Sequence, residues 1–333
     1  MRVLGNLLKE LVPYCPRPSA IHPQVETVAD RGLSWALRSR LLTEDDPRAE
    51  RLRAARIAWL TSLAQPTADL EALQLATDWH TWLFFHDDLC DASAVGREPR
   101  RQQVLDEMLT RALRDGDLAS PHPLARSLVD VRRRLERRAG EAWSQRFAAH
   151  VESYFRGNLW EAVNRQRLRV PDLATYVAMR RVTGAVDSCF DLVFAGAGFA
   201  ADSELLADPG CRRLARMANR HICWINDVFG LEKELQEGNV NNLVLVLRHH
   251  ERIGARQAIH RALAMCDAEM RRFLDLESRL RQSGAFAVED FDRYGRLLRS
   301  WMRGHVDWYA ETGRYSGDLE EISLRPRTAA AAG

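Results

Sequence analysis

Along most of the chain, apolar residues recur every three or four positions, the spacing that brings side chains to one face of an α-helix. Two stripes show this repeat: Leu70, Leu73, Ala76, Trp79 and Leu83, and then Phe291, Tyr294, Leu297, Leu298 and Trp301. Glycine and proline interrupt the pattern at intervals that suit helices. The segment 240–247, VNNLVLVL, is the one stretch that could form a strand. We therefore expect an all-α fold.

The same pattern favours one domain over several. No internal repeat is visible, and no long Ser- or Gly-rich linker divides the chain. The arginine-dense segment 125–138 is typical of an amphipathic helix with a solvated face. After Tyr315 the apolar pattern stops, and the chain ends in RPRTAAAAG. We expect a single domain over residues 1–315 and a disordered tail over 316–333.

Composition and charge exclude several classes of function. The 333 residues carry 48 basic and 46 acidic side chains, a formal net charge of +2, which suggests no nucleic-acid partner. The longest apolar run, 192–201, is half as long as the ~20 residues that a membrane-spanning helix needs. The N-terminal segment lacks the pattern of a secretory signal, and the six cysteines form no CxxC pair. We expect a cytoplasmic protein with reduced thiols and no membrane span.

The first stretch with candidate chemistry is TDWHTWLFFHDDLCD, residues 77–91. Its apolar part belongs in a core, yet it ends in aspartates. On a helix, Asp87 and Asp91 lie four residues apart and share a face, where their like charges invite a cation between them. Carboxylate oxygens favour Mg²⁺ over softer metals, and Mg²⁺ often bridges carboxylates to substrate phosphates. The alternative is an acidic helix end that leads into a loop.

The second stretch is WINDVFGLEKE, residues 224–234. Asn226, Gly230 and Glu234 follow one another at four-residue intervals and therefore share one helix face. The amide oxygen of Asn226 and the carboxylate of Glu234 are ligand types that Mg²⁺ accepts. Lys233, one of only two lysines in the chain, could reach a phosphate. Taken alone, the stretch also fits an ordinary amphipathic helix.

Together, the two stretches resemble the signature of bacterial class I terpene synthases. That family carries a DDxxD motif and, further along, a triad written N(D/E)xx(S/T)xx(K/R)(E/D). Here DDLCD and NDVFGLEKE start 226 − 87 = 139 residues apart. The resemblance extends over nearly the whole chain, and it implies a single-domain α-helical bundle around a central active-site cavity.

Two further motifs carry the resemblance. RRVTG supplies Arg180, Thr183 and Gly184 at the spacing of the family's diphosphate sensor, linker and effector residues. The pair Arg314–Tyr315 matches the family's C-terminal Arg-Tyr pair. A glycine at the effector position suits a helix break, because glycine adopts backbone angles that other residues resist. A plain helix C-cap is the alternative for Gly184.

One position departs from the family's pattern. The middle residue of the triad, usually a hydroxyl, is Gly230, so that one metal ligand is missing and water must fill its place. Mg²⁺ commonly keeps several waters, which makes this arrangement chemically tolerable. Weaker Mg²⁺ affinity, a preference for Mn²⁺ or impaired activity are the consequences to test.

The resemblance also implies roles for the polar residues. Three Mg²⁺ ions, with Mn²⁺ as an alternative, would be held on one wall by Asp87 and Asp91 and on the other by Asn226, Glu234 and water at Gly230. Hydrogen bonds to the departing diphosphate would come from Arg180, Lys233, Arg314 and Tyr315, and Thr183 would couple Arg180 to the Gly184 carbonyl.

Helix geometry separates two aspartates from this set. Asp88 lies about 100° around the helix from Asp87. We expect Asp88 to pair with an arginine rather than to bind metal. We also expect its side chain to lie next to the bound substrate. Asp227 faces away from Asn226 by the same reasoning, and we leave it outside the site.

A carbocation survives only where water is excluded, so we expect apolar and aromatic walls. Leu83, Phe84 and His80 precede Asp87 on the same side of the helix and are candidate substrate contacts. Trp308 occupies the aromatic position that the family places before its Arg-Tyr pair, and Trp301 is a further candidate. Core packing is the alternative for each aromatic residue. For His80 the alternatives are a hydrogen-bonded core histidine and a proton acceptor.

The resemblance implies Mg²⁺-dependent ionisation and cyclisation of an acyclic isoprenyl diphosphate, most often farnesyl diphosphate in bacterial relatives of this length. Geranyl or geranylgeranyl diphosphate as substrate is the alternative within the class. A chain-elongating synthase would carry a second DDxxD motif, and a di-iron bundle would need Glu-x-x-His pairs. A non-catalytic protein that binds isoprenoid diphosphates is the alternative from another class, and Gly230 is the argument for it. Homodimerisation is common in the family.

Overall fold

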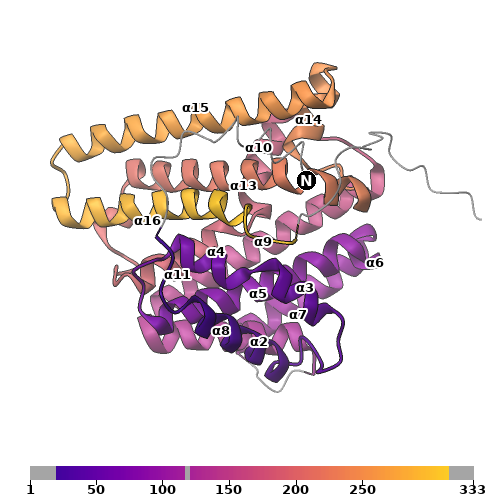
Figure 1. Ribbon diagram of the computed structural model, residues 1–333, viewed down its shortest axis with the longest axis horizontal. Helices are drawn as coiled ribbons and strands as arrows, with labels where there is room; N and C mark the ends of the chain where they lie inside the picture. The colour runs from indigo at the N-terminus through magenta and orange to yellow at the C-terminus, as the bar shows by residue number, and fades with distance from the viewer. Residues whose placement is uncertain (1–19, 117–120, 315–333) are drawn as a thin grey trace, which may run out of the picture.

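The computed structural model describes residues 20–116 and 121–314, and in this part of the chain helices are joined by short loops without any strand (Figure 1). The helices are α2 (Val25–Arg38), α3 (Arg48–Ala55), α4 (Ile57–Ala64), α5 (Leu70–Ala92), α6 (Ala94–Arg97), α7 (Pro99–Asp115), α8 (Pro123–Ala139), α9 (Glu141–Arg167), α10 (Leu173–Thr183), α11 (Val186–Gly196), α12 (Glu204–Ala207), α13 (Pro209–Glu237), α14 (Leu243–Glu251), α15 (Ala255–Gln282) and α16 (Val288–Trp308). The all-α prediction is confirmed for the described residues.

The segment 240–247 is not a strand, which corrects the one strand-like expectation. Asn242 ends an extended stretch and caps α14, because its side-chain oxygen accepts hydrogen bonds from the backbone N–H groups of Val244 (2.8 Å) and Leu245 (3.4 Å). An N-cap asparagine satisfies backbone donors that a helix start leaves unpaired. A short apolar run is equally compatible with a buried strand and a buried helix. Here the Asn242 N-cap favours the helix.

Two groups of helices enclose the centre of the molecule (Figure 1). Helices α13, α15 and α16 pack side by side in one group, and α2 and α8 pack against α5 in the other. Helix α9 contacts α7 and α8 as well as α10 and α11, and α11 contacts both α5 and α13. As a result α5 and α13, the helices with the two acidic motifs, come together in the middle of the fold.

Tryptophans anchor α5 in the core. Trp79 and Trp82 stack with ring centroids 5.0 Å apart, and Phe147 of α9 meets Trp79 edge-on at 4.9 Å. The indole N–H of Trp79 donates to the Ser188 hydroxyl (3.2 Å), and that of Trp82 donates to the Leu124 carbonyl (2.8 Å). Buried aromatic rings with satisfied N–H groups contribute strongly to core stability. This anchoring fixes which face of α5 turns toward α13.

The arginine-dense helix α8 is amphipathic, as its sequence predicted, and it also supports α5. Its apolar side chains, such as Leu128 and Leu135, are buried. Arg134 lies 2.6 Å from the Asp78 carboxylate on α5, and Arg138 pairs with Asp69, the N-cap of α5. The arginines of α8 are therefore more than a solvated face.

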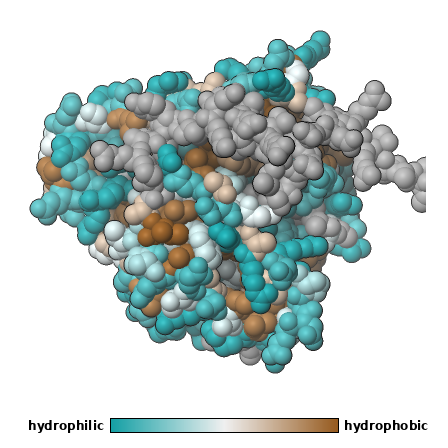
Figure 2. Space-filling view, viewed as in Figure 1, coloured by the Kyte–Doolittle hydropathy of each residue, from teal (hydrophilic) through white to brown (hydrophobic). Residues whose placement is uncertain are grey.

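The face of the molecule in Figure 2 is largely hydrophilic, with separate hydrophobic patches. None of the described helices is long and apolar enough to cross a membrane. The cysteines between residues 20 and 314 are all buried and form no disulfide with one another, as expected of thiols. The predicted tail, 316–333, lies outside the described residues.

Candidate active site

A cavity opens where α5, α13 and the C-terminal end of α16 meet, and it carries polar side chains at its mouth and apolar or aromatic ones along its walls. It is lined by Leu60, His80, Leu83, Phe84, Asp87, Tyr154, Glu161, Arg180, Thr183, Gly184, Ala185, Val186, Cys189, Ile222, Cys223, Asn226, Lys233, Glu234, Asn239, Asn241, Trp301, His305, Trp308 and Arg314. Of the predicted site residues, Asp88 and Gly230 do not line it. Tyr315 and the side chain of Asp91 lie outside the described parts of the structure.

The aspartate-rich motif meets two cations. Arg314 donates hydrogen bonds from Nη2 to Asp88 Oδ1 (2.8 Å) and to Asp87 Oδ2 (3.1 Å), and Lys233 Nζ lies 3.9 Å from Asp87 Oδ2. Asp88 thus has the arginine partner that helix geometry predicted. Removal from water raises the pKa of the Asp87 carboxyl, but the charges of Lys233, Arg314 and Arg180 outweigh this effect and leave that pKa lowered. Asp87 is therefore ionised at neutral pH.

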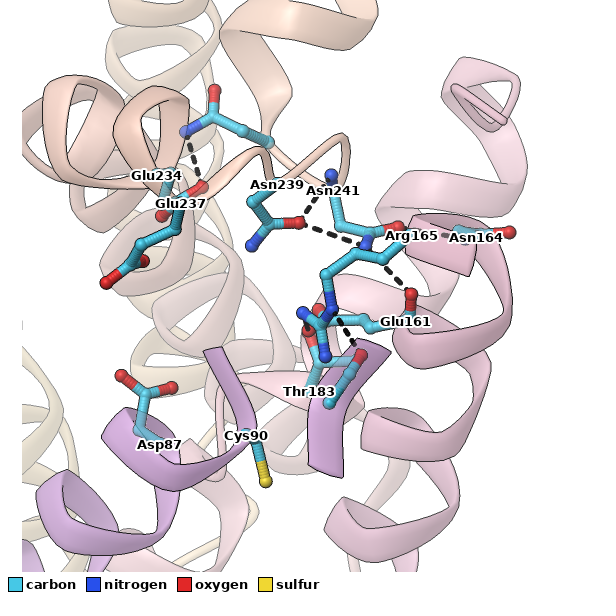
Figure 3. Close-up of polar contacts among 12 residues, drawn as sticks. Asp87, Cys90, Glu161, Asn164, Arg165, Thr183, Glu234, Glu237, Asn239 and Asn241 are labelled. Atoms are coloured by element: carbon cyan, nitrogen blue, oxygen red, sulfur yellow. Dashed lines mark hydrogen bonds and ion pairs between the residues drawn. The ribbon is translucent and has the colours of Figure 1, made fainter. Parts of the chain in front are cut away.

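The second motif presents its oxygens from α13. In Figure 3, Glu234 and Glu237 of α13 lie above Asp87 of α5, and Glu234 and Asp87 both line the cavity. Glu234 Oε2 accepts a hydrogen bond from Asn242 Nδ2 (3.0 Å), which holds its carboxylate at the cavity. Lys233 Nζ lies 3.1 Å from Glu237 Oε2, one turn further along α13. The structure thus brings both predicted acidic motifs to one cavity mouth.

Arg180 connects α10 to the second motif. Its Nη2 donates to Asn226 Oδ1 (2.9 Å), its Nε donates to Asp227 Oδ1 (2.8 Å), and its Nη1 lies 3.3 Å from the Thr183 hydroxyl. Tyr176 also donates from its hydroxyl to Asp227 Oδ2 (2.5 Å). Asp227 does not line the cavity, but it contacts Arg180, because one guanidinium with donors in several directions reaches both neighbouring side chains. Asp227 positions the predicted diphosphate sensor.

Gly184 ends α10, but backbone strain is not the reason for a glycine here. Its φ of −79° and ψ of −5° are ordinary helical angles, and the positive φ of 55° belongs to Ala185. A Cβ on Gly184 would lie only 2.3 Å from Cys223 Sγ on α13. Close approach of α10 to α13, and not conformational freedom, therefore requires this glycine, which corrects the sequence-based argument.

Aromatic residues close the cavity wall below the charged mouth. The Arg314 guanidinium lies 4.2 Å from the centre of the Phe84 ring, and Phe84 meets Trp308 edge-on at 6.0 Å. The indole N–H of Trp308 donates to the carbonyls of Ala55 (2.9 Å) and Arg56 (3.0 Å), which fixes the ring. These residues are both cavity lining and core, so the two alternatives weighed for them are not exclusive.

A polar network that was not among the predicted site residues lies on the side of the mouth formed by α9 and the segment before α14 (Figure 3). Asn164 Nδ2 donates to Asn241 Oδ1 (2.8 Å), and Asn241 Nδ2 donates to Asn239 Oδ1 (3.1 Å). Arg165 donates from Nε to the Gly96 carbonyl (3.0 Å) and lies 3.5 Å from the Glu161 carboxylate. Positions 161, 164 and 165 share a helix face, and that spacing was the available signal.

A second missed residue is Tyr309. Asn226 Nδ2 donates to the Tyr309 hydroxyl (2.8 Å), and the Tyr309 ring stacks on Phe229 with centroids 3.8 Å apart. These contacts orient the Asn226 amide so that its oxygen faces Arg180. No charge or motif marked Tyr309 in the sequence.

The mouth suits a metal that takes part of its coordination from a substrate. Within residues 20–116 and 121–314, no three His, Cys, Asp or Glu side chains are grouped so as to hold an ion alone. Asp87, Asn226 and Glu234 all offer hard oxygen atoms to the same cavity. Mg²⁺ is usually bound through one or two carboxylates together with waters and substrate phosphates. The residues present fit such an ion.

Comparison with known proteins identifies the class. Residues 78–272 match the model of the family described as terpene synthase family 2, C-terminal metal binding. The chain therefore belongs to this family, for which dependence on a divalent metal follows from the metal-binding region.

Individual relatives agree with this assignment. The chain is 37% identical to (+)-T-muurolol synthase of Roseiflexus castenholzii, over 90% of this chain and 92% of that protein. It is 34% identical to 10-epi-cubebol synthase of Sorangium cellulosum, over 91% and 96%. Among solved structures, germacradien-4-ol synthase from Streptomyces citricolor superposes with a TM-score of 0.78 at 26% identity, over 89% of this chain and 97% of that one. The fold is thus that of the class I α-helical terpene synthases.

Proposed function

We propose that the chain is a metal-dependent sesquiterpene cyclase that ionises farnesyl diphosphate, cyclises the resulting cation and releases diphosphate. One observation carries the proposal: Asp87, Lys233 and Arg314 meet at the mouth of a cavity whose walls are apolar and aromatic. Charge at one end and an apolar interior match a substrate with a diphosphate head and a hydrocarbon tail. A single domain over residues 1–315 would contain all the residues involved.

Three positively charged side chains would bind the departing diphosphate. Arg180, Lys233 and Arg314 all line the cavity, and Arg180 and Arg314 are held in place by Asp227 and Asp88 respectively. As the allylic C–O bond breaks, negative charge builds on the diphosphate, and charged N–H donors stabilise this charge more than they stabilise the intact ester. Lys233 and Arg314 now neutralise Asp87, and we expect them to turn to the diphosphate when metal occupies that carboxylate. Tyr315 would add a hydroxyl donor.

Metal would be held by Asp87 and Asp91 on one wall and by Asn226 and Glu234 on the other, with water in the place that Gly230 leaves. We expect three Mg²⁺ ions, with Mn²⁺ as a substitute. When bound, these ions supply Lewis-acid stabilisation of the departing diphosphate.

The walls would protect and guide the cation. Phe84, Trp301 and Trp308 are aromatic residues in the lining of the cavity, and Leu83 adds an aliphatic side chain. Aromatic faces attract a desolvated cation by ~2 kcal/mol or more, and an apolar wall keeps water away from it. Thr183 and Gly184 would link diphosphate binding at Arg180 to the carbonyl that faces the developing cation.

The choice of farnesyl diphosphate rests on relatives. Two of them, (+)-T-muurolol synthase of Roseiflexus castenholzii and 4-epi-cubebol synthase of Streptosporangium roseum, carry names that specify (2E,6E)-farnesyl diphosphate as the molecule cyclised. The second is 31% identical over 91% of this chain.

The direct test is incubation of the purified protein with geranyl, farnesyl or geranylgeranyl diphosphate, with and without Mg²⁺, followed by gas chromatography and mass spectrometry. We expect a cyclic product from farnesyl diphosphate only when Mg²⁺ is present. Asp87→Ala should abolish it, whereas Asp275→Ala, on the exposed side of α15, should not. Metal-dependent binding of all three substrates without product would instead indicate a non-catalytic binding protein.

A further inference from the structure

His80 lies on the cavity wall, on the same helix as Asp87 and seven residues before it. Seven residues of α-helix span about 10 Å. Because Asp87 stands at the charged mouth, His80 lies at the depth that the hydrocarbon part of a substrate would occupy. Its side chain is almost completely buried from bulk solvent, with 4% exposed, and yet it borders the cavity.

Hydrogen bonding assigns the roles of its two ring nitrogens. Nδ1 lies 2.7 Å from the carbonyl oxygen of Ala76, one turn earlier on α5. Because a carbonyl can only accept, Nδ1 carries the proton and donates it to this bond. In a neutral imidazole the other nitrogen, Nε2, then carries the lone pair. Nε2 has no hydrogen-bond partner in the part of the chain that the structure describes.

The surroundings of the ring keep it neutral and suit a cation on it. Burial lowers the pKa of the His80 imidazole to about 4, although the hydrogen bond to Ala76 acts in the opposite direction. The ring stacks on Trp301, with centroids 5.0 Å apart and planes 25° from parallel. An aromatic face stabilises a positive charge placed over it. The pair therefore combines a free lone pair with a surface that tolerates the charge produced when this lone pair is used.

We propose that Nε2 of His80 accepts the proton that leaves in the last step of cyclisation. The inference rests on the proposed function. The C–H bond next to the cationic carbon breaks, its electron pair forms a C=C bond of the product, and the proton forms an N–H bond at Nε2. Charge moves from carbon to the imidazolium beside Trp301, so that the net charge inside the cavity does not change.

The same environment lets His80 lose the accepted proton before the next turnover. An imidazole with a pKa of about 4 is still far more basic than a hydrocarbon, so that it takes a proton from a carbocation. Once the product leaves and water enters, an imidazolium with this pKa gives up its proton at neutral pH. A stronger base would stay protonated between turnovers.

A second buried histidine provides a matched control. His221 on α13 is fully buried, burial lowers its pKa to about 4 as well, and neither ring nitrogen has a hydrogen-bond partner among the described residues. Unlike His80, it does not line the cavity. His221→Phe therefore removes a neutral, buried imidazole that lies outside the cavity lining, whereas His80→Phe removes one that lines the cavity.

The test compares His80→Phe with His221→Phe and the unmodified protein. Phenylalanine keeps the stack on Trp301 and removes the lone pair. For His80→Phe we expect diphosphate release from farnesyl diphosphate within about threefold of normal, while the share of the main alkene among the products falls at least about fivefold. In its place, alkenes formed by loss of other protons, or alcohols, should increase. His221→Phe should leave the product distribution unchanged.

Failure of this inference differs from failure of the proposed function. If the unmodified protein releases no diphosphate from any isoprenyl diphosphate, the proposed function is wrong. An unchanged product distribution in His80→Phe overturns the role of His80, as does an alcohol as the sole product of the unmodified protein. Should His80→Phe not fold, His80→Asn decides by the same criterion, because its side-chain amide can still donate to Ala76 but carries no basic nitrogen.

Discussion

Arg180 and Asp227 form an ion pair in the interior, with Nε donating to Oδ1 at 2.8 Å. Asp227 is fully buried, and Arg180 keeps 11% of its side-chain surface exposed, at the cavity. Burial lowers the pKa of the Arg180 guanidinium, but the Asp227 carboxylate reverses this effect and raises the pKa well above its usual value. The pair therefore presents a permanently charged, oriented donor to the cavity and ties α10 to α13.

Asp227→Asn should destabilise the fold and slow the reaction. Breaking a buried pair by removing one charge costs about 3–5 kcal/mol, since the other charge stays uncompensated. We expect a lower free energy of unfolding in urea and slower release of diphosphate, because Arg180 loses its orientation. Asp292→Asn is the control: its pair with Arg281 is exposed and should contribute less than about 1 kcal/mol. Equal, small changes in both variants would contradict the importance of the buried pair.

The helices and the shared face within each acidic motif were predictable from spacing, whereas the meeting of the two motifs at one cavity was implied by the resemblance to class I terpene synthases. Four-residue intervals place Asn226 and Glu234 on one face of α13, and both line the cavity together with Asp87. Spacing also placed Asp88 beside an arginine, which proved to be Arg314. Such arguments need only the helix repeat and the sign of each charge.

What the sequence could not provide is the distance between helices. Asp227 on α13 supports the site only because the Arg180 side chain reaches it from another helix, α10. The need for glycine at 184 depends on how closely Cys223 approaches, and Tyr309 reaches Asn226 across 83 residues of sequence. Contacts of this kind follow from packing, which periodicity does not encode.

Gly184→Ala should be destabilising for a reason that a second substitution can remove. The new Cβ would lie 2.3 Å from Cys223 Sγ, and overpacking of this kind costs about 1–3 kcal/mol. Cys223→Ala deletes the sulfur, so that the double variant should be more stable than Gly184→Ala alone. In a double-mutant cycle measured by urea unfolding, the double variant should therefore lose less free energy of unfolding than the sum of the losses in the two single variants. Additive effects would mean that backbone conformation, and not space, requires the glycine.

Gly230→Ser tests whether a metal ligand is missing from the second motif. The hydroxyl would lie on the face of α13 that carries Asn226 and Glu234. We expect the Mg²⁺ concentration for half-maximal diphosphate release to fall by about tenfold, a change typical of a restored metal-site group. Asn226→Ala should act in the opposite direction and remove most turnover.

The control for this experiment is Gly254→Ser, which adds a hydroxyl at an exposed helix N-cap that does not line the cavity. Its Mg²⁺ requirement should equal that of the unmodified protein. Thermal unfolding of each variant separates loss of fold from loss of metal. A higher Mg²⁺ requirement in a well-folded Gly230→Ser would show that water serves this position better than serine.

Asp106 on α7 makes stability depend on pH. Its carboxylate is buried, accepts a hydrogen bond from Gln102 Nε2 (2.8 Å) through Oδ1, and has no partner at Oδ2 among the described residues. Burial raises the pKa of this carboxyl from 3.8 to about 7, which the bond from Gln102 only partly offsets. Between these two values the unfolded chain has lost the proton that the folded chain keeps, so the free energy of unfolding falls as the pH rises through this window.

Asp106→Asn should therefore stabilise the protein, and more so at pH 8 than at pH 5. At pH 8 we expect a gain on the order of 1–4 kcal/mol in the free energy of unfolding, because asparagine stays neutral in both states. Glu107→Gln is a matched control on the same helix: Glu107 accepts from Gln103 over the same 2.8 Å, but both side chains are exposed. Urea unfolding of the three proteins at both pH values checks the argument, and equal gains for the two variants, or a larger gain at pH 5, would contradict it.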